Sequence, residues 1–123
     1  MSGAGRHRIE IEPGSDRVRV MFAGEVVADT RRALILHETG LPPRPYIPPE
    51  DVRQEFLTAT ATHTRCPYKG EASYWSIRVN GRQAEDAVWG YLDPIADCAA
   101  IKGYFCFYPE RVDRIEMEAS TAG

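Results

Sequence analysis

The sequence predicts a small, mainly β protein that folds as one domain. Apolar and polar residues alternate in several short runs, turn dipeptides separate these runs, and one segment is too rich in proline for a helix or an inner strand. The length of 123 residues fits a single domain. We expect a flexible N-terminus at residues 1–7, one domain at residues 8–117 and a flexible C-terminal tail at residues 118–123.

The first half of the chain reads as a series of strands. Residues 8–12 alternate between polar and apolar, and residues 17–22 and 25–29 flank Ala23-Gly24, which predicts a β-hairpin. The apolar run at residues 33–37 is typical of a more central strand. The short spacing between the runs favours an antiparallel meander over βαβ units.

Residues 41–49 contain five prolines in nine positions, so we expect an extended, stiff segment anchored by Tyr46 and Ile47. Residues 49–57 predict the one short helix. Proline is common in the first turn of a helix, and the acidic Glu50 and Asp51 would stabilise the positive N-terminal end of this one. Apolar residues also recur near helical spacing.

The second half predicts further strands. Threonine-rich residues 58–64 lead into Cys66-Pro67-Tyr68-Lys69-Gly70, and residues 71–79 form an aromatic-rich strand that turns at Asn80-Gly81. We expect strands again at residues 87–91, 104–108 and 112–117, with a short helical turn between Ile95 and Ile101.

Composition limits the possible functions. A formal net charge of −3 argues against nucleic-acid binding, which needs a concentrated basic face. No apolar run is long enough to span a bilayer and no hydrophobic stretch follows the N-terminus, so we expect a cytoplasmic protein without membrane contact. Three cysteines without a Cys-x-x-Cys pair suggest reduced thiols, no metal site and no cofactor. Monomer and homodimer both remain open.

The segment around Cys66 holds the candidate catalytic residues. Its thiol has Arg65, Lys69 and His63 within three positions, and such cations and bases can activate a thiol as a nucleophile. Lys69 precedes a glycine that gives room for close approach, so it could clamp an anion. The alternatives are a Cys66 thiol that only packs under the sheet and a Lys69 that only bridges to a carboxylate such as Glu71 or Asp93.

Aromatic residues suggest a pocket. Trp89 and Tyr91 share one face of a strand because Gly90 points away, and with Tyr46 and Tyr68 they could wall a site for a flat or cationic small molecule. His63 and Arg65 are further candidate ligand contacts. The alternative is ordinary packing of these rings in the core and at its rim.

The order of these motifs resembles the bacterial family called domain of unknown function 427, which is also labelled nucleotidyltransferase-like in some catalogues. The most specific match is Cys66-Pro67-Tyr68-Lys69-Gly70 followed by Ala72-Ser73-Tyr74-Trp75, and it continues through Ala87-Val88-Trp89-Gly90-Tyr91. The resemblance implies a β-tent-like fold, in which two small antiparallel sheets lean together over a ligand groove. The paired Cys-x-x-Cys zinc sites of that group are missing here, as are a phosphate-binding glycine loop and a magnesium-binding aspartate pair.

We therefore expect a domain that binds a small molecule in an aromatic groove beside the 66–70 loop. One alternative is a small enzyme that uses Cys66 as nucleophile or Lys69 as an electrophilic or anion clamp. Another is a protein-interaction domain with exposed aromatic hot spots.

Overall fold

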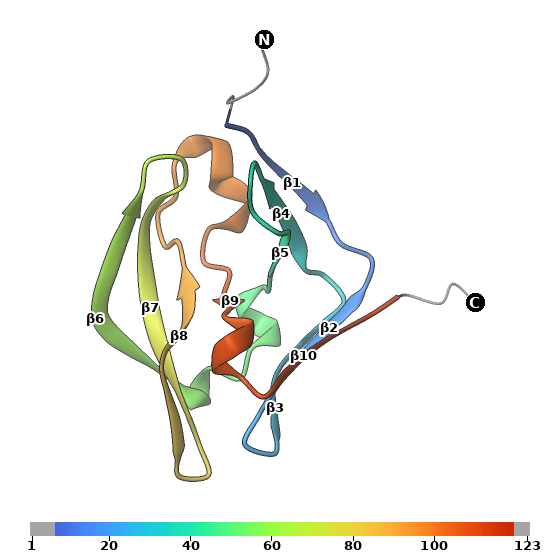
Figure 1. Ribbon diagram of the computed structural model, residues 1–123, viewed down its shortest axis with the longest axis vertical. Coiled ribbons are helices and arrows are strands. Elements are labelled where there is room, and N and C mark those ends of the chain that lie inside the picture. The colour runs from blue at the N-terminus through green and yellow to red at the C-terminus, as the bar shows by residue number, and fades with distance from the viewer. Residues whose placement is uncertain (1–6, 120–123) are drawn as a thin grey trace.

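The computed structural model describes residues 7–119 and shows three antiparallel β-sheets (Figure 1). The predicted mainly β, antiparallel class is confirmed, with three sheets in place of two and no closed barrel within the described residues. Most of the two predicted flexible termini, residues 1–6 and 120–123, lies outside the described residues. The strands are β1 (Ile9–Pro13), β2 (Arg17–Phe22), β3 (Glu25–Thr30), β4 (Leu34–Glu38), β5 (Arg44–Tyr46), β6 (Leu57–Cys66), β7 (Gly70–Val79), β8 (Arg82–Gly90), β9 (Cys106–Phe107) and β10 (Arg114–Glu118).

The sheets combine strands that are distant in the chain. Their orders are β1-β4-β5, β10-β2-β3 and β6-β7-β8-β9. The meander predicted for the first half of the chain is wrong beyond the β2–β3 hairpin, because β1 pairs with β4 and that hairpin joins β10. Strands β6, β7 and β8 do form a meander. In Figure 1 the four-stranded sheet forms one wall and the two three-stranded sheets form the other.

Both predicted hairpin turns are present, and the chain takes left-handed backbone angles there. Asn80 and Gly81 have φ values of 50° and 82° between β7 and β8, and Ala23 and Gly24 have 52° and 83° between β2 and β3. Two successive positive φ values match the twist of the flanking strands, which is why such short turns close hairpins.

The helix predicted at residues 49–57 is two separate 3₁₀ turns, η1 (Pro49–Asp51) and η2 (Gln54–Phe56). Between them Val52 forms an antiparallel bridge with Ala28, and the Arg53 amide donates to the Val27 carbonyl at 2.8 Å. A nine-residue segment gains little from helix formation alone, so pairing with β3 and burial of Val52 outweigh the helical pattern. Two further 3₁₀ segments are η3 (Ala96–Ile101) and η4 (Pro109–Arg111).

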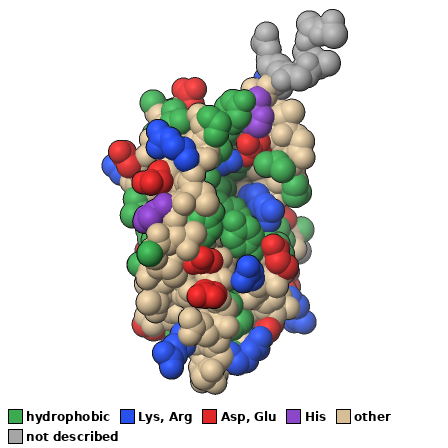
Figure 2. All heavy atoms as spheres, turned by 60° about the vertical axis from the view of Figure 1, so that its left-hand side comes forward, with side chains coloured by type: hydrophobic (Ala, Val, Ile, Leu, Met, Phe, Trp, Pro, Cys, Tyr) green, Lys and Arg blue, Asp and Glu red, His purple; other side chains and the backbone are tan. Residues whose placement is uncertain are grey.

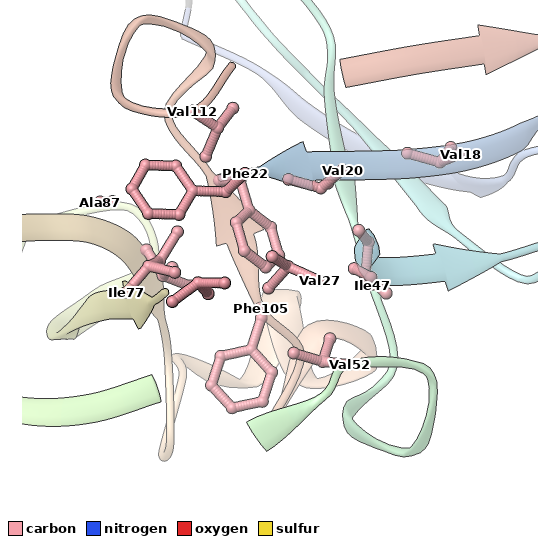
Figure 3. Close-up of a cluster of buried hydrophobic side chains, with 14 of the residues drawn as sticks. Val18, Val20, Phe22, Val27, Ile47, Val52, Ile77, Ala87, Phe105 and Val112 are labelled. Carbon is pink, nitrogen blue, oxygen red and sulfur yellow. The ribbon is translucent and has the colours of Figure 1, made fainter. Parts of the chain in front are cut away.

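The main core lies between the four-stranded sheet and the β10-β2-β3 sheet (Figure 3). Alternation along β2 points Val18, Val20 and Phe22 inward, where they meet Ile77 and Phe105 from the opposite wall. Full burial of a side chain of this size contributes about 1.5–3 kcal/mol to folding. This apolar layer packs the four-stranded sheet against the β10-β2-β3 sheet.

A second buried cluster joins β4 and β5 to β7 and β8. The proline-rich segment forms β5, the edge strand of the β1-β4-β5 sheet. A proline is tolerated on an edge strand because its missing N–H can face away from the neighbouring strand. Tyr46 and Ile47 are each 1% exposed, as their predicted anchoring role requires, and Ile47 exchanges two backbone hydrogen bonds with Phe105. This arrangement brings β5 against the aromatic face of β8.

Candidate functional site

A cavity of about 200 Å³ lies between β4, β5 and the faces of β7 and β8. Five of its eleven lining residues are aromatic, and three charged side chains, Glu38, Arg44 and Lys69, reach it. Figure 2 shows apolar side chains within a hollow between rims of charged residues. The aromatic lining residues are Tyr46, Tyr74, Trp89, Tyr91 and Tyr108.

Strand pairing sets the aromatic walls. Tyr74 lies directly opposite Trp89 across the β7–β8 ladder, and Tyr91 follows on the same face as Trp89, as the sequence predicts. On the opposite face, a Cβ added to Gly90 would lie 2.5 Å from the Tyr104 carbonyl oxygen. Only glycine allows the backbone to pass there, so Gly90 keeps both aromatic neighbours in place.

Trp89 has close contacts on two sides. Its indole nitrogen donates to the Tyr46 hydroxyl at 3.1 Å, and the two rings meet edge to face with centroids 6.2 Å apart. The Tyr108 ring lies 4.3 Å from the indole at a tilt of 40°, and the Arg44 guanidinium lies 5.6 Å from the indole centroid. Such contacts add to area burial, so the wall is ordered before any ligand arrives.

Three phenols of the cavity, those of Tyr46, Tyr91 and Tyr108, have raised pKa values. Burial raises the pKa of both Tyr46 and Tyr91 well above the ordinary phenol range. Burial, followed by hydrogen bonding to Tyr74, raises the pKa of Tyr108 to about 12. These hydroxyls therefore keep a hydrogen to donate.

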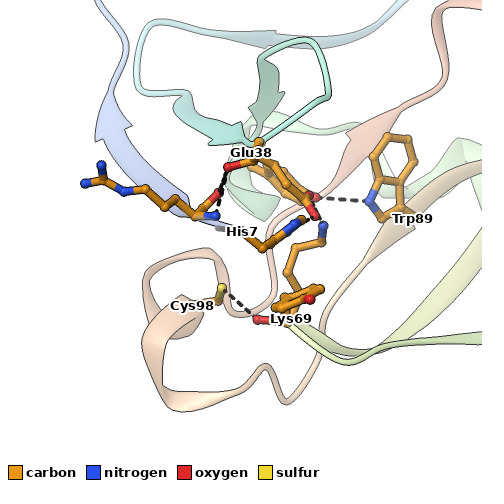
Figure 4. Close-up of polar contacts among 9 residues, drawn as sticks. His7, Glu38, Lys69, Trp89 and Cys98 are labelled. Carbon is orange, nitrogen blue, oxygen red and sulfur yellow. Dashed lines mark hydrogen bonds and ion pairs between the residues drawn. The ribbon is translucent and has the colours of Figure 1, made fainter. Parts of the chain in front are cut away.

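An ion pair between Lys69 and Glu38 forms the polar end of the cavity (Figure 4). The side chains are only 10% and 7% exposed, and the second Glu38 oxygen lies 2.8 Å from His7 Nε2. The predicted bridging partners of Lys69, Glu71 and Asp93, do not fill that role, because the carboxylate comes from β4, 31 residues earlier in the chain. An amine that donates in an ion pair carries a proton in place of a lone pair, so this geometry supports electrostatic contact rather than nucleophilic attack.

Two hydrogen bonds connect the 66–70 loop to the segment at and just before η3. The Ile95 amide donates to the Lys69 carbonyl at 2.9 Å, and the Cys98 thiol donates to the Tyr68 carbonyl at 3.6 Å. Gly70 has a φ of 117°, where a side chain would be strained. These constraints direct Lys69 inward.

His7 and Tyr68 cover the outer side of this ion pair. Their rings stack with centroids 3.8 Å apart and planes 16° apart, and Tyr68 is 47% exposed. His7 belongs to the segment predicted to be flexible, yet it contacts both Tyr68 and Glu38. Tyr68, a predicted ligand contact, thus lies outside the aromatic cavity and contributes to its cover.

Three other predicted site residues lie at the end of β6 and are divided between the two faces of the strand. His63 and Arg65 pair with Ser73 and Glu71, whereas Cys66 pairs with Gly70. Alternation in this regular stretch places His63 and Arg65 on the exposed outer face and Cys66 on the inner face. His63 therefore does not reach Cys66 as a general base, and Arg65 lines a separate hollow beside Pro94.

Sequence reasoning missed several lining residues, including Glu38, Arg44, Tyr74 and Tyr108. Two of them had a usable signal. Glu38 follows Leu36 at a spacing of two on a predicted strand, and Arg44 stands two positions before Tyr46, so each shares a face with a buried neighbour. Tyr74 and Tyr108 were recognised as aromatic but could not be assigned to the cavity, because their positions depend on long-range pairing.

Within residues 7–119 no cluster of three or more histidine, cysteine, aspartate or glutamate side chains has the arrangement of a metal site. No helix in this part of the chain is long and apolar enough to cross a membrane. The three cysteines are free thiols, with Cys98 and Cys106 buried and Cys66 half-buried.

Fold and site together define a small antiparallel β domain with an aromatic cavity that ends in an ion pair. The family model described as a domain of unknown function (DUF427) matches residues 10–118. The chain belongs to this family, as its resemblance in sequence implied. No curated protein matches the chain.

Proposed function

We propose that this domain binds a small, flat molecule in the aromatic cavity. The observation that carries the proposal is the lining itself, in which five aromatic side chains surround about 200 Å³ and only a few polar groups converge. Binding sites for small molecules combine apolar and aromatic walls with placed polar groups, and both kinds of group line this cavity. A cavity of about 150 Å³ accommodates benzene, so this space suits one ring with one or two substituents.

The polar end of the cavity would orient the ligand. Lys69 is oriented by Glu38, and Glu38 in turn contacts His7, so the ammonium position is defined without a ligand. Side chains ordered in advance lose less entropy on binding. In this proposal Lys69, Trp89 and Tyr91 contact the ligand, Tyr46 positions Trp89, and the partner is a small molecule rather than nucleic acid or a membrane.

The alternative of a thiol enzyme has less support. Cys66 is half-buried on the inner face, but the histidine that could act as its base lies on the outer face. A protein-interaction role would use exposed apolar side chains. The large exposed ones among residues 7–119 are dispersed. Leu41 lies at the cavity, Leu92 and Ile95 line the hollow beside Pro94, Met117 lies on β10, and the exposed aromatic Tyr68 is stacked on His7. We favour binding in the cytoplasm, where free thiols such as these persist.

The two tryptophans allow a direct test. Trp89 lines the cavity, whereas Trp75 packs against Phe105 in the main core at 4.9 Å between centroids. Protein labelled with 5-fluorotryptophan gives one ¹⁹F signal from each, and each signal can be assigned with a Trp75→Phe or Trp89→Phe variant. A library of single-ring compounds would then be titrated into the labelled protein.

We expect some compounds to shift the Trp89 signal in a saturable way while the Trp75 signal stays in place. Trp75 is the internal control, because a general effect of solvent or partial unfolding moves both signals. The proposal is refuted if no compound shifts the Trp89 signal at millimolar concentration, or if compounds shift only the Trp75 signal.

A further inference from the structure

Two acceptor groups of the cavity, the Glu38 carboxylate and the Tyr46 hydroxyl, already accept hydrogen bonds from the protein. Both oxygens of Glu38 are engaged, one by Lys69 and the other by His7. The Tyr46 oxygen accepts from Trp89, which leaves its own hydrogen without an acceptor among residues 7–119. A ligand that complements this lining must therefore supply acceptors.

The charged side chains of the lining, one acidic and two basic, leave an excess of positive charge. Glu38 and Lys69 compensate each other, and Arg44 is the third charged lining residue. Within the described part of the chain, the Arg44 guanidinium has neither an ion pair nor a side-chain hydrogen bond, although the residue is half-buried. One positive charge thus remains for a ligand to neutralise.

Arg44 is also restrained in position. It pairs with Leu36 in the β4–β5 ladder between Pro43 and Pro45, whose rings restrict the backbone. Its guanidinium rests over the Trp89 indole and lies near Tyr108. A guanidinium held against an aromatic face keeps its planar N–H edge available, and that edge matches the two oxygens of a carboxylate.

We propose that the ligand is an anion, namely a small planar ring that carries a carboxylate, with the ring between Trp89 and Tyr91 and the carboxylate on Arg44. This inference rests on the proposed function and selects among the ligands that it allows. Aromatic walls alone also suit a cation. Arg44 opposes a cation here, because a like charge would be brought beside it in a partly desolvated space.

The test compares ring carboxylates with neutral and cationic analogues of the same size. Benzoate, nicotinate and furan-2-carboxylate would each be titrated beside the corresponding carboxamide, and benzylammonium serves as the cation. The readout is the Trp89 ¹⁹F shift in the wild type, in Arg44→Gln and in Arg65→Gln. Arg65→Gln removes the same charge from the outer face of β6 and is the matched control.

We expect at least one carboxylate to bind about tenfold or more tightly than its amide, the factor typical of a charge-assisted hydrogen bond. Arg44→Gln should weaken carboxylate binding more than amide binding and so remove this preference, whereas Arg65→Gln should keep it. Added salt should weaken carboxylate binding more than amide binding.

The possible failures can be told apart. If carboxylates, amides and benzylammonium shift Trp89 with equal affinity, the anion inference is overturned while the proposed cavity binding stands. If Arg44→Gln keeps the preference, the placement of the carboxylate on Arg44 is overturned. If benzylammonium binds most tightly, the inference is likewise overturned. If no compound in this set or in the wider library shifts Trp89, both proposals fail.

Discussion

Breaking the ion pair between Lys69 and Glu38 should destabilise the protein far more than breaking an exposed pair. The two side chains are 10% and 7% exposed, so removal of one leaves the other charge buried without full compensation. Loss of one partner from a buried pair costs about 3–5 kcal/mol, whereas replacement of both by apolar side chains of similar volume is often neutral. We therefore expect Lys69→Met and Glu38→Met each to be destabilising, and the double variant to lie within about 1 kcal/mol of the wild type.

The two single variants should differ in a defined order. In Lys69→Met, Glu38 keeps its contact with His7 at 2.8 Å. In Glu38→Met, Lys69 has no other side-chain partner within the described residues, and His7 also loses its contact. Glu38→Met should therefore have the lower stability of the two.

Urea denaturation followed by tryptophan fluorescence gives the four free energies of the double-mutant cycle. For a domain of this size a loss of about 3 kcal/mol lowers Tm by about 10 °C. Glu12→Met is the control, because the Glu12–His37 pair is exposed and should contribute less than about 1 kcal/mol. Single variants that lose less than about 1 kcal/mol, or additive effects in the double variant, would refute the reasoning.

Three further predictions concern the backbone, acid stability and thiols. Gly90→Ala should cost about 3 kcal/mol or more in urea denaturation, because its Cβ would lie 2.5 Å from the Tyr104 carbonyl oxygen. Hydrogen bonds from two threonine hydroxyls hold the pKa of Asp86 below its usual value. The ionised carboxylate therefore adds its full contribution to the free energy of unfolding above about pH 4, and this contribution is lost as the pH falls through the folded-state pKa. Asp86→Asn should therefore lose less stability than the wild type on acidification, as measured by urea midpoints. Iodoacetamide followed by mass spectrometry should modify half-buried Cys66 before the buried Cys98 and Cys106, since burial raises the pKa of both.

Each of these predictions has a contrary result. Gly14→Ala is the control for Gly90→Ala, because its Cβ would meet the Ile35 side chain at 3.0 Å and the nearest backbone atom, the Ala33 oxygen, only at 3.4 Å. An equal cost in the two variants would contradict the proposed clash. Equal loss of stability on acidification in the wild type and Asp86→Asn would show that this carboxylate does not contribute to the pH dependence of stability. Early modification of Cys106 would show that its burial is not maintained in solution.

The sequence alone was enough to predict most of the strands, the hairpin turns and part of the cavity wall, but not β5, which was expected only as an extended segment. Alternation assigns the faces of a strand, so Trp89 and Tyr91 could be placed together, and Asn80-Gly81 specifies a turn through its own backbone preference. The same alternation places His63 and Cys66, three positions apart, on opposite faces once the strand is known to extend to Cys66.

Tertiary structure decided which faces meet. The partner of Lys69 is Glu38 on another sheet, not the nearby Glu71 or Asp93, and Arg44 reaches Trp89 only because β5 lies against β8. Likewise, Val52 interrupts the expected helix by pairing with β3. Local patterns determine the conformation of a segment and its buried side, but contacts between segments depend on the packing of all sheets around a shared core, which no single stretch encodes.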